Sequence, residues 1–374
     1  MQILIIPDSF KESLTATEVA RALYMGIHKV LPEAVINQIP FSDGGEGALE
    51  VLKKQAQGVL VSCQTENALG EKINAPYFLF EDQKSAWIEL SQASGLAQIA
   101  PEKRDALNAS TYGTGLQIKD AIARGCNTIT LGLGGSATTD GGAGLFEALG
   151  GVLLDHKGAY LERGGLALKN LSSIILPKGL DGIYWKVACD VDNPLLGPSG
   201  AASVYGPQKG ASASDVVQLD HALSQFATVI HHHFGRQITT LEGGGAAGGT
   251  AAGMYGFFNA TLQSGFSLLS EMIGLEKQIK QSDLIITAEG KMDGQSLQGK
   301  LTGSVAHLGK KHNIPVVGIA GALEGPMDAF FNAGFAGVFS IQNGPLSLKD
   351  SMENAEILLS NTAANLIKFY ISKP

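Results

Sequence analysis

Short apolar runs alternate with amphipathic segments at both ends of the chain. An apolar strand is predicted at 2–6, and a helix is predicted after it because apolar residues recur at helical spacing behind a capping box of Thr15 and Glu18. The same order recurs later, with strands predicted at 35–39, 284–288 and 315–320 and helices at 48–55 and 304–311. Strands that alternate with helices predict a parallel sheet covered by helices.

The middle of the chain has a different pattern. From residue 58 to residue 90 apolar and polar residues alternate, which predicts antiparallel strands. Further strands are predicted at 151–155 and 184–189, and further helices at 114–124, 215–234 and 250–260. The chain is expected to close with one helix, capped by Ser347 and Asp350 and mostly buried along one face as far as Phe369.

These patterns predict an α/β fold with two domains, because a chain of 374 residues exceeds the size at which single cores stop growing. A doubly wound parallel-sheet (Rossmann-like) domain is expected from residues 1–58 plus 261–374. A mixed α/β domain at 59–260 is expected to be inserted in it. The active site is expected in the cleft between the two domains.

Glycine-rich stretches follow several of the predicted strands. The most prominent is 131–144, LGLGGSATTDGGAG, which lies between an apolar run and a helix-like segment. Glycines permit tight turns and close approach, and a helix N-terminus entered in this way presents unpaired N–H groups that suit a phosphate. The alternative is a glycine-rich turn that only packs. A second dense glycine loop lies at 243–249.

Composition and charge narrow the function. Hydrophobic residues make up 44% and charged residues 17% of the chain, as in a soluble globular protein. The net charge of −8 disfavours nucleic acid and anionic membranes as partners. Apolar runs are too short for a membrane span or a signal peptide, so a cytoplasmic location is expected. The 3 cysteines are widely spaced, which indicates reduced thiols rather than disulfides or a zinc site.

Loop carboxylates and lysines suggest phosphoryl transfer. That reaction needs an anion cradle, a cation or magnesium, and a carboxylate that orients or deprotonates the acceptor hydroxyl. The candidate carboxylates follow predicted strands and the candidate cations lie in loops: Asp8, Asp43, Asp190, Glu289 and Asp293; Lys11, Lys209, Lys291 and Lys300. A single aspartate in such a place is more often a helix cap, but a series of them in equivalent places favours a site.

Two segments of the chain resemble known nucleotide-binding motifs. The segment 132–137 fits G-x-G-x-x-A after a strand, and Asp155 follows at about 20 residues, where a dinucleotide fold places its ribose acid. An NAD-dependent oxidoreductase of a small hydroxy acid is therefore an alternative. The segment 294–301 nearly matches the phosphate loop G-x-x-x-x-G-K-[ST], but Leu301 cannot ligate magnesium. Lys300 can still meet a phosphate there.

Several linked motifs resemble those of the bacterial type I glycerate kinases. They are PDSFKESL from Pro7, DGGEG from Asp43, GGSA from Gly134, ACDV from Ala188, GPQKGA from Gly206 and GKMD from Gly290. The resemblance runs from Met1 to the last helix. It implies two α/β domains, one inserted in the other, and ATP-dependent phosphorylation of D-glycerate with magnesium in organic acid catabolism. It also implies 2-phosphoglycerate rather than 3-phosphoglycerate as the usual product.

On this resemblance we assign roles to the candidate residues. Asp190 is expected to orient the acceptor hydroxyl, and Lys11 to take part in catalysis. The N-terminal turns are expected to hold glycerate or its transferring phosphate through Asp8, Ser9, Asp43, Gly44, Gly45 and Glu46. The residues expected to bind ATP are Gly134, Gly135, Ser136, Ala137, Thr138, Asp140, Lys209, Gly243, Gly244, Gly245, Gly248, Gly249, Lys291 and Lys300. Glu289 and Asp293 either bind magnesium or cap the following helix.

The chain departs from the family pattern at some positions. Tyr112 stands where relatives commonly have the arginine of Arg-Gly-Thr-Gly, Thr139 where asparagine is usual, and Lys291 where arginine is usual. A lost arginine would remove a carboxylate or phosphate clamp at that place. A non-catalytic ATP or small-molecule sensor of the same fold is therefore a further alternative. The oligomeric state, monomer or homodimer, stays open.

Overall fold

The computed structural model describes residues 1–41, 47–297 and 300–372. Contacts divide the chain into two compact units, unit 1 (Met1–Asp43 with Phe266–Pro374) and unit 2 (Gly44–Gly265). The domain limits expected at 58 and 261 remain a prediction. They assign α2 (Ala48–Gln55) to the first domain, whereas this helix packs against strands of unit 2. None of the described helices combines the length and the apolar character that a membrane span requires.

Unit 1 is built, within the described residues, on a five-stranded parallel sheet in the order β13-β12-β11-β1-β2. Its strands are β1 (Gln2–Pro7), β2 (Val35–Gln38), β11 (Leu284–Met292), β12 (Val316–Leu323) and β13 (Phe335–Ser340). The chain runs outward from β1 to β2 on one side and from β11 to β12 and β13 on the other. The sheet is therefore doubly wound, as predicted, and its order reverses between β1 and β11.

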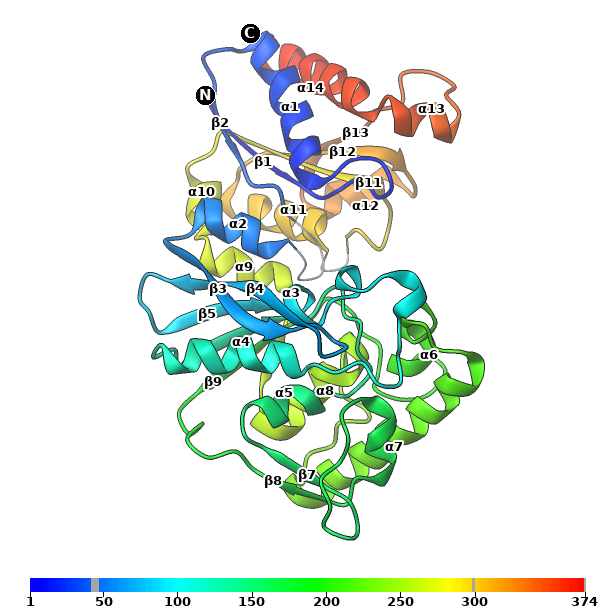
Figure 1. The fold of residues 1–374 in the computed structure, drawn as a ribbon. Coiled ribbons are helices and arrows are strands. Elements are labelled where there is room, and N and C mark those ends of the chain that lie inside the picture. Colours follow the sequence, from blue (N-terminus) through cyan, green and yellow to red (C-terminus); the bar gives the residue numbers. More distant parts are fainter. Residues whose placement is uncertain (42–46, 298–299, 373–374) are drawn as a thin grey trace. The chain divides into compact units, whose positions relative to one another are not determined.

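Helices cover both faces of the unit 1 sheet (Figure 1). α1 (Ala16–Val30) and α14 (Ala355–Ile371) pack together on one face, where an aliphatic core joins them to the strands. The other helices of this part of the chain are α9 (Gly265–Met272), α10 (Leu275–Lys280), α11 (Leu301–His312), α12 (Met327–Ala333) and α13 (Leu348–Glu353). α1 begins at the predicted capping box, with the Thr15 hydroxyl accepting from the Glu18 N–H.

Two predictions for this part of the chain were wrong in detail. The closing helix is divided at Asn354 into α13, capped by Ser347, and α14, because Asn354 has a non-helical backbone. Phe369 is 69% exposed, so the buried stripe ends before it. β11 also continues beyond its predicted end at Ala288, because hydrogen bonding to β12 extends through Met292. Glu289 and Lys291 are therefore strand residues rather than loop residues.

The main sheet of unit 2, as far as the chain is described, has six strands in the order β10-β9-β6-β5-β4-β3. These are β3 (Gly58–Glu66), β4 (Lys72–Phe80), β5 (Ser85–Glu89), β6 (Thr128–Gly132), β9 (Tyr184–Ala188) and β10 (Thr261–Gln263). β3, β4 and β5 pair antiparallel, as the alternating pattern predicted, whereas β5, β6, β9 and β10 pair parallel. β7 (Val152–Leu154) and β8 (Ser173–Ile175) form a separate antiparallel pair.

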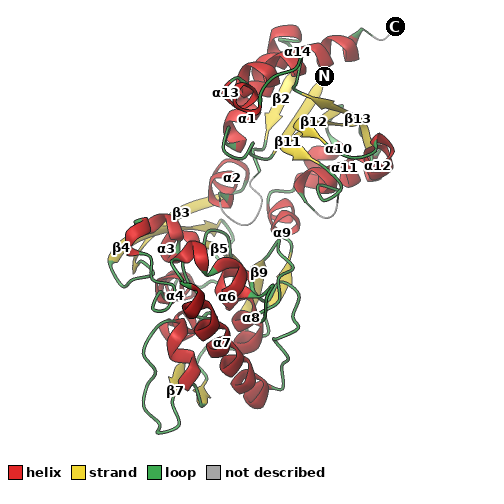
Figure 2. Ribbon diagram, turned by 90° about the vertical axis from the view of Figure 1, so that its right-hand side faces the viewer, coloured by secondary structure: helices red, strands yellow, loops and turns green. Residues whose placement is uncertain are grey.

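The helices of unit 2 lie around this mixed sheet. Besides α2 they are α3 (Ser91–Ser94), α4 (Tyr112–Ala123), α5 (Ala143–Ala148), α6 (Ala201–Tyr205), α7 (Ala213–Phe234) and α8 (Ala246–Phe258). α2 and α4 lie on opposite faces of the strands β3 to β5 (Figure 1). α7 packs against α6 and α8 (Figure 2). α8 contains three residues with left-handed backbone, Ala247, Gly248 and Gly249, so the glycine loop and the helix predicted there form one kinked element.

Candidate active site

The glycine stretch after β6 folds as predicted into a turn that leads into α5, but its anion site is already occupied. The Asp140 carboxylate is fully buried and accepts hydrogen bonds from the N–H groups of Thr111, Gly142 and Gly144, at 2.8, 3.2 and 3.2 Å. The Leu145 N–H donates to the Thr111 hydroxyl at 2.9 Å. Because protein groups satisfy the start of α5, these hydrogen bonds weigh against the predicted phosphate there. Burial raises the pKa of Asp140, and these hydrogen bonds oppose that shift.

The second glycine loop packs directly onto the first one. The Gly141 N–H donates to the Gly248 carbonyl at 3.0 Å. A Cβ on Gly248 would lie 2.0 Å from the Thr138 oxygen, and a Cβ on Gly253 would lie 1.8 Å from the Gly141 oxygen. The other predicted glycines of this loop, Gly243, Gly244, Gly245 and Gly249, also stand against protein atoms. For this loop, close packing is the function that the contacts support.

A pocket of about 340 Å³ in unit 2 gathers several of the predicted site residues. It is lined by Leu96, Leu133, Gly134, Gly135, Ser136, Ala188, Cys189, Asp190, Val191, Tyr205, Gln208, Lys209, Ala246 and Ala247. Two residues that the sequence assigned to different substrates, Asp190 and Lys209, therefore share one pocket. Ala137 and Thr138 are buried neighbours of this lining.

Lys209 is the buried cation of the unit 2 pocket. Its side chain comes from the turn after α6, and the residue is only 2% exposed. Its ammonium donates to the Ser136 hydroxyl at 3.1 Å and to the Thr138 carbonyl at 2.6 Å. Burial lowers the pKa of Lys209 to about 7, and the Asp140 charge opposes that shift. The ammonium has three donors, so an anion in the pocket can take one of them.

Asp190 follows the carboxyl end of β9, as predicted. Its carboxylate accepts a hydrogen bond from the Gly265 N–H at 2.9 Å. A Cβ on Gly265 would lie 2.6 Å from the Asp190 Oδ2 atom, so glycine is needed for the carboxylate to keep this place. The Cys189 thiol beside it donates to the carbonyls of Val191 and Gly243. Asp190 is therefore held by backbone while it lines the pocket.

Unit 1 has its own pocket, of about 430 Å³, at the carboxyl ends of β1 and β11. Because the strand order reverses between these strands, this is the place where open α/β sheets bind ligands. The predicted residues Asp8, Ser9, Lys11, Glu289, Lys291, Asp293 and Lys300 all line it. The structure therefore brings together lysines that the sequence assigned to ATP and residues that it assigned to glycerate. Asp43, Gly44, Gly45 and Glu46 lie outside the described residues.

The charges in the unit 1 pocket are interleaved. Lys291 Nζ lies 2.9 Å from Glu324 Oε2 and 3.6 Å from Asp293 Oδ2, and Lys300 Nζ lies 4.0 Å from Glu289 Oε1. The Asp8 carboxylate accepts from the Ser9 N–H at 2.6 Å. Ion pairs with Glu324 and Asp293 raise the pKa of Lys291, which therefore stays charged.

The two carboxylates proposed for magnesium differ in their partners. Asp293 accepts hydrogen bonds from the N–H groups of Gln295 and Ser296. It therefore caps backbone N–H groups, as one of the two expected roles requires, but it closes a turn rather than starting a helix. Glu289 accepts from the Thr302 hydroxyl at 3.3 Å, near the start of α11. The described residues contain no group of three acidic, histidine or cysteine side chains that could hold a metal on its own. Magnesium at nucleotide sites needs only one or two carboxylates together with phosphate oxygens, so Glu289 still fits that role.

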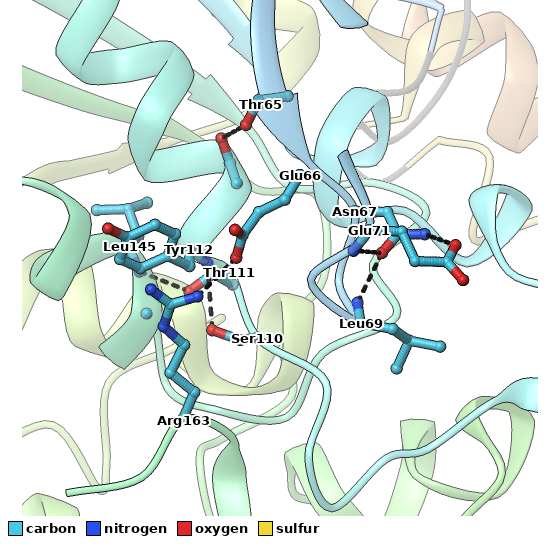
Figure 3. Close-up of polar contacts among 12 residues, drawn as sticks. Thr65, Glu66, Asn67, Leu69, Glu71, Ser110, Thr111, Tyr112, Leu145 and Arg163 are labelled. Atoms are coloured by element: carbon cyan, nitrogen blue, oxygen red, sulfur yellow. Dashed lines mark hydrogen bonds and ion pairs between the residues drawn. The ribbon is translucent and has the colours of Figure 1, made fainter. Parts of the chain in front are cut away.

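Tyr112, which stands where an arginine was expected, lies beside Arg163 and Glu66 (Figure 3). The Arg163 guanidinium carbon lies 3.3 Å from the centre of its ring, and the same guanidinium pairs with Glu66 at 2.7 Å. The lining of the unit 2 pocket comes from other residues. The aromatic ring is therefore explained by stacking with Arg163.

The structure does not place Asp155 where the dinucleotide-binding alternative needs an acidic residue. The neighbours of β6 in the main sheet are β5 and β9, whereas β7, which precedes Asp155, belongs to the separate pair with β8. Asp155 closes a local turn by accepting from the N–H groups of Lys157 and Ala159. It is therefore not on the strand where a ribose acid is needed.

The sequence did not single out Ala247 or Glu89. Ala247 lines the unit 2 pocket with a φ of 50°, which an alanine rarely adopts and which no sequence pattern indicates. Glu89 is fully buried at the end of β5, where its carboxylate accepts from the Leu49 N–H at the start of α2. A carboxylate inside the otherwise apolar run 86–90 was the available signal for Glu89.

Comparisons with known proteins agree with this architecture. The family model described as the glycerate kinase family matches residues 3–371. A glycerate kinase of Halalkalibacterium halodurans is 42% identical, with 97% of each chain covered. A glycerate 2-kinase of Escherichia coli K12 is 40% identical, covering 98% of this chain and 97% of that protein.

A solved structure extends the agreement to the fold. The crystal structure from Salmonella typhimurium LT2, provisionally assigned as glycerate kinase 2, superposes with a TM-score of 0.84 at 40% identity. The match covers 100% of this chain and 98% of the other. Because sequence and fold both match over nearly their full length, this chain belongs to the glycerate kinase family.

Proposed function

We propose that this protein transfers the γ-phosphoryl group of ATP to D-glycerate and forms 2-phosphoglycerate. Family membership supports the glycerate kinase activity, and the relative named glycerate 2-kinase, at 40% identity, supports the position of the new phosphate. The relatives favour this function over the oxidoreductase and sensor alternatives. The displaced position of Asp155 weakens the oxidoreductase reading independently.

The unit 2 pocket supports the role of acceptor site. An acceptor hydroxyl needs a carboxylate to orient it or take its proton, and glycerate also carries a carboxylate that needs a cation. Asp190 and Lys209 are the charged residues that supply these two groups in one pocket. The presence of both residues in one lining is the observation that carries the proposal. In this role Gly134 and Gly135 serve glycerate or the transferring phosphate rather than the rest of the nucleotide.

The proton path follows from these positions. Asp190 would accept the proton of the attacking hydroxyl, and Lys209 would hold the glycerate carboxylate through its ammonium. Magnesium, when bound with the nucleotide, offsets the negative charge of the phosphates. Of the described residues, Glu289 would hold it, because its carboxylate lines the pocket that contains Lys11, Lys291 and Lys300.

The test is glycerate-dependent ADP release by the wild-type protein and by Asp190→Asn. Loss of the carboxylate should lower kcat by about 10² to 10⁴ while ADP affinity is kept. Asp192→Asn is the matched control, because Asp192 is exposed and lies two positions away. Phosphorus NMR of the product distinguishes 2-phosphoglycerate from 3-phosphoglycerate. Near-normal turnover by Asp190→Asn would exclude Asp190 as the base, and no release by the wild type would exclude the kinase.

A further inference from the structure

The lining of the unit 1 pocket includes apolar residues as well as charged ones. Phe10, Ile341 and Ala355 are buried apolar residues of this lining, and Leu348 and Met352 of α13 also belong to it. Leu348 is 77% exposed although it lines the pocket. A phosphate or a three-carbon acid alone would leave the apolar residues uncovered. A ligand that covers these apolar residues and also meets the lysines carries an apolar part together with negative charge.

The charged part of the pocket lining fits a polyphosphate. Lys11, Lys291 and Lys300 line it together, and Lys300 directly precedes α11, whose first turn faces the Glu289 carboxylate through Thr302. The lining also carries four carboxylates, those of Asp8, Glu12, Glu289 and Asp293, which would repel a bare triphosphate. The same carboxylates favour a nucleotide that arrives with magnesium, since magnesium takes carboxylate and phosphate oxygens together.

Two glycines, Gly290 and Gly321, also belong to the pocket lining. A Cβ on Gly321 would lie 2.5 Å from the Gly290 oxygen, so the adjacent strands β11 and β12 stay free of side chains at this point. Gly290 in turn approaches the Phe10 backbone, with 3.3 Å from a Cβ to the Phe10 Cα. These glycines allow β11, β12 and the Phe10 turn to pack closely, and both line the pocket without a side chain.

We propose that the unit 1 pocket binds the magnesium nucleotide, with the base against Leu348 and Met352 and the phosphates at the three lysines. This inference rests on the proposed kinase function and places its donor substrate. It replaces the sequence-based expectation that the glycine loops at 134–142 and 243–249 hold ATP. In those loops the N–H groups of Gly142 and Gly144 donate to Asp140, and the N–H of Gly141 donates to the Gly248 carbonyl.

The experiment is isothermal titration of the full-length protein with ADP and magnesium, without glycerate. Leu348→Asp removes the exposed apolar residue of the lining, and its Kd for ADP should rise about ten-fold. Lys300→Ala should raise the Kd by about ten-fold or more through the lost phosphate contact. Leu346→Asp and Lys349→Ala are the controls, because both residues are exposed neighbours outside this lining. Both control proteins should bind ADP as the wild type does.

Two outcomes would overturn the inference. One is an ADP Kd within about two-fold of wild type for both Leu348→Asp and Lys300→Ala. The other is a loss of ADP binding in Lys209→Met, in unit 2, that exceeds the loss in both unit 1 variants. Glycerate-dependent ADP release is measured on the same proteins. If the wild-type protein turns over glycerate and the unit 1 variants bind ADP unchanged, only the nucleotide site is refuted. If the wild-type protein binds ADP but releases none in the presence of glycerate, the proposed kinase function is refuted.

Discussion

The Lys209 ammonium donates to the Thr138 carbonyl oxygen at 2.6 Å and is buried in the pocket that Asp190 lines. Burial lowers the pKa of Lys209 to about 7. The ammonium is therefore charged below that pH and loses its charge as the pH rises through it. An acceptor site built on this lysine must lose affinity for a carboxylate on the alkaline side.

The first prediction is a rise in the KM for glycerate above neutral pH. With saturating magnesium-ATP, this KM should stay flat from about pH 6 to about pH 7 and rise by up to about ten-fold per unit above it. Lys209→Met should raise the KM at pH 6 and remove the pH dependence, because the variant has no titrating cation. A KM for glycerate that is constant across the range in the wild type would contradict the role of Lys209.

The second prediction concerns the packing of the two glycine loops. Gly248 has a φ of 65° and no room for a Cβ, so Gly248→Ala combines backbone strain with a backbone clash. We expect a loss of about 3 kcal/mol in the free energy of unfolding. Ala247→Gly is the matched change, because Ala247 already has a left-handed backbone. Urea denaturation should show it no less stable than wild type, and up to about 1 kcal/mol more stable.

Equal stability of these two variants would mean that the loops can separate without cost. In that case the close approach of Gly248 to Thr138 would not hold the Thr138 carbonyl in place, and other contacts would have to position this partner of Lys209.

The third prediction concerns Glu89, which is fully buried. Its carboxylate accepts from the Leu49 N–H and from the Gln92 amide, each at 2.9 Å. Glu89→Ala would leave the buried Leu49 N–H without this partner and remove the bond to the half-buried Gln92, and should lower the free energy of unfolding by about 2 to 3 kcal/mol. α2 directly follows 43–47, which the sequence predicts to hold glycerate, so the KM for glycerate should also rise.

Gln92→Ala separates these two effects of Glu89. It removes one hydrogen bond but leaves the carboxylate at the start of α2, so only stability should fall, by about 1 kcal/mol. An unchanged KM for glycerate in folded Glu89→Ala protein would limit Glu89 to a structural role.

The sequence predicted the strands and helices well because burial imposes a period on them. The doubly wound order of unit 1 followed from such patterns, and the start of α1 followed from the polar pair Thr15 and Glu18. The anion site expected at α5 stays a prediction that the Asp140 hydrogen bonds weigh against, because an aspartate that receives the helix N–H groups has the same local sequence as a loop that binds phosphate. The hydrogen bonds that Gly142 and Gly144 donate to the buried Asp140 distinguish the two.

The grouping of the site residues could not be predicted either. Asp190 and Lys209 lie in different motifs, and their shared pocket depends on how α6 and β9 each pack against α8. Ala247 has a left-handed backbone that its residue type disfavours, so tertiary contacts rather than local preference determine it.

The last prediction tests whether the departure at Tyr112 affects function. Arg163 stacks on the Tyr112 ring at 3.3 Å while it pairs with Glu66, so Tyr112→Arg would place two guanidinium groups together (Figure 3). We expect a loss of about 1 kcal/mol in the free energy of unfolding, because the cation–π contact becomes a like-charge contact. The KM values for ATP and glycerate should stay within about two-fold of wild type, because other residues line both pockets.

Tyr112→Phe keeps the stacking surface and should match wild type in stability and kinetics. A KM that falls by about ten-fold in Tyr112→Arg would instead show that an arginine at this position acts as a substrate clamp, which this chain has lost.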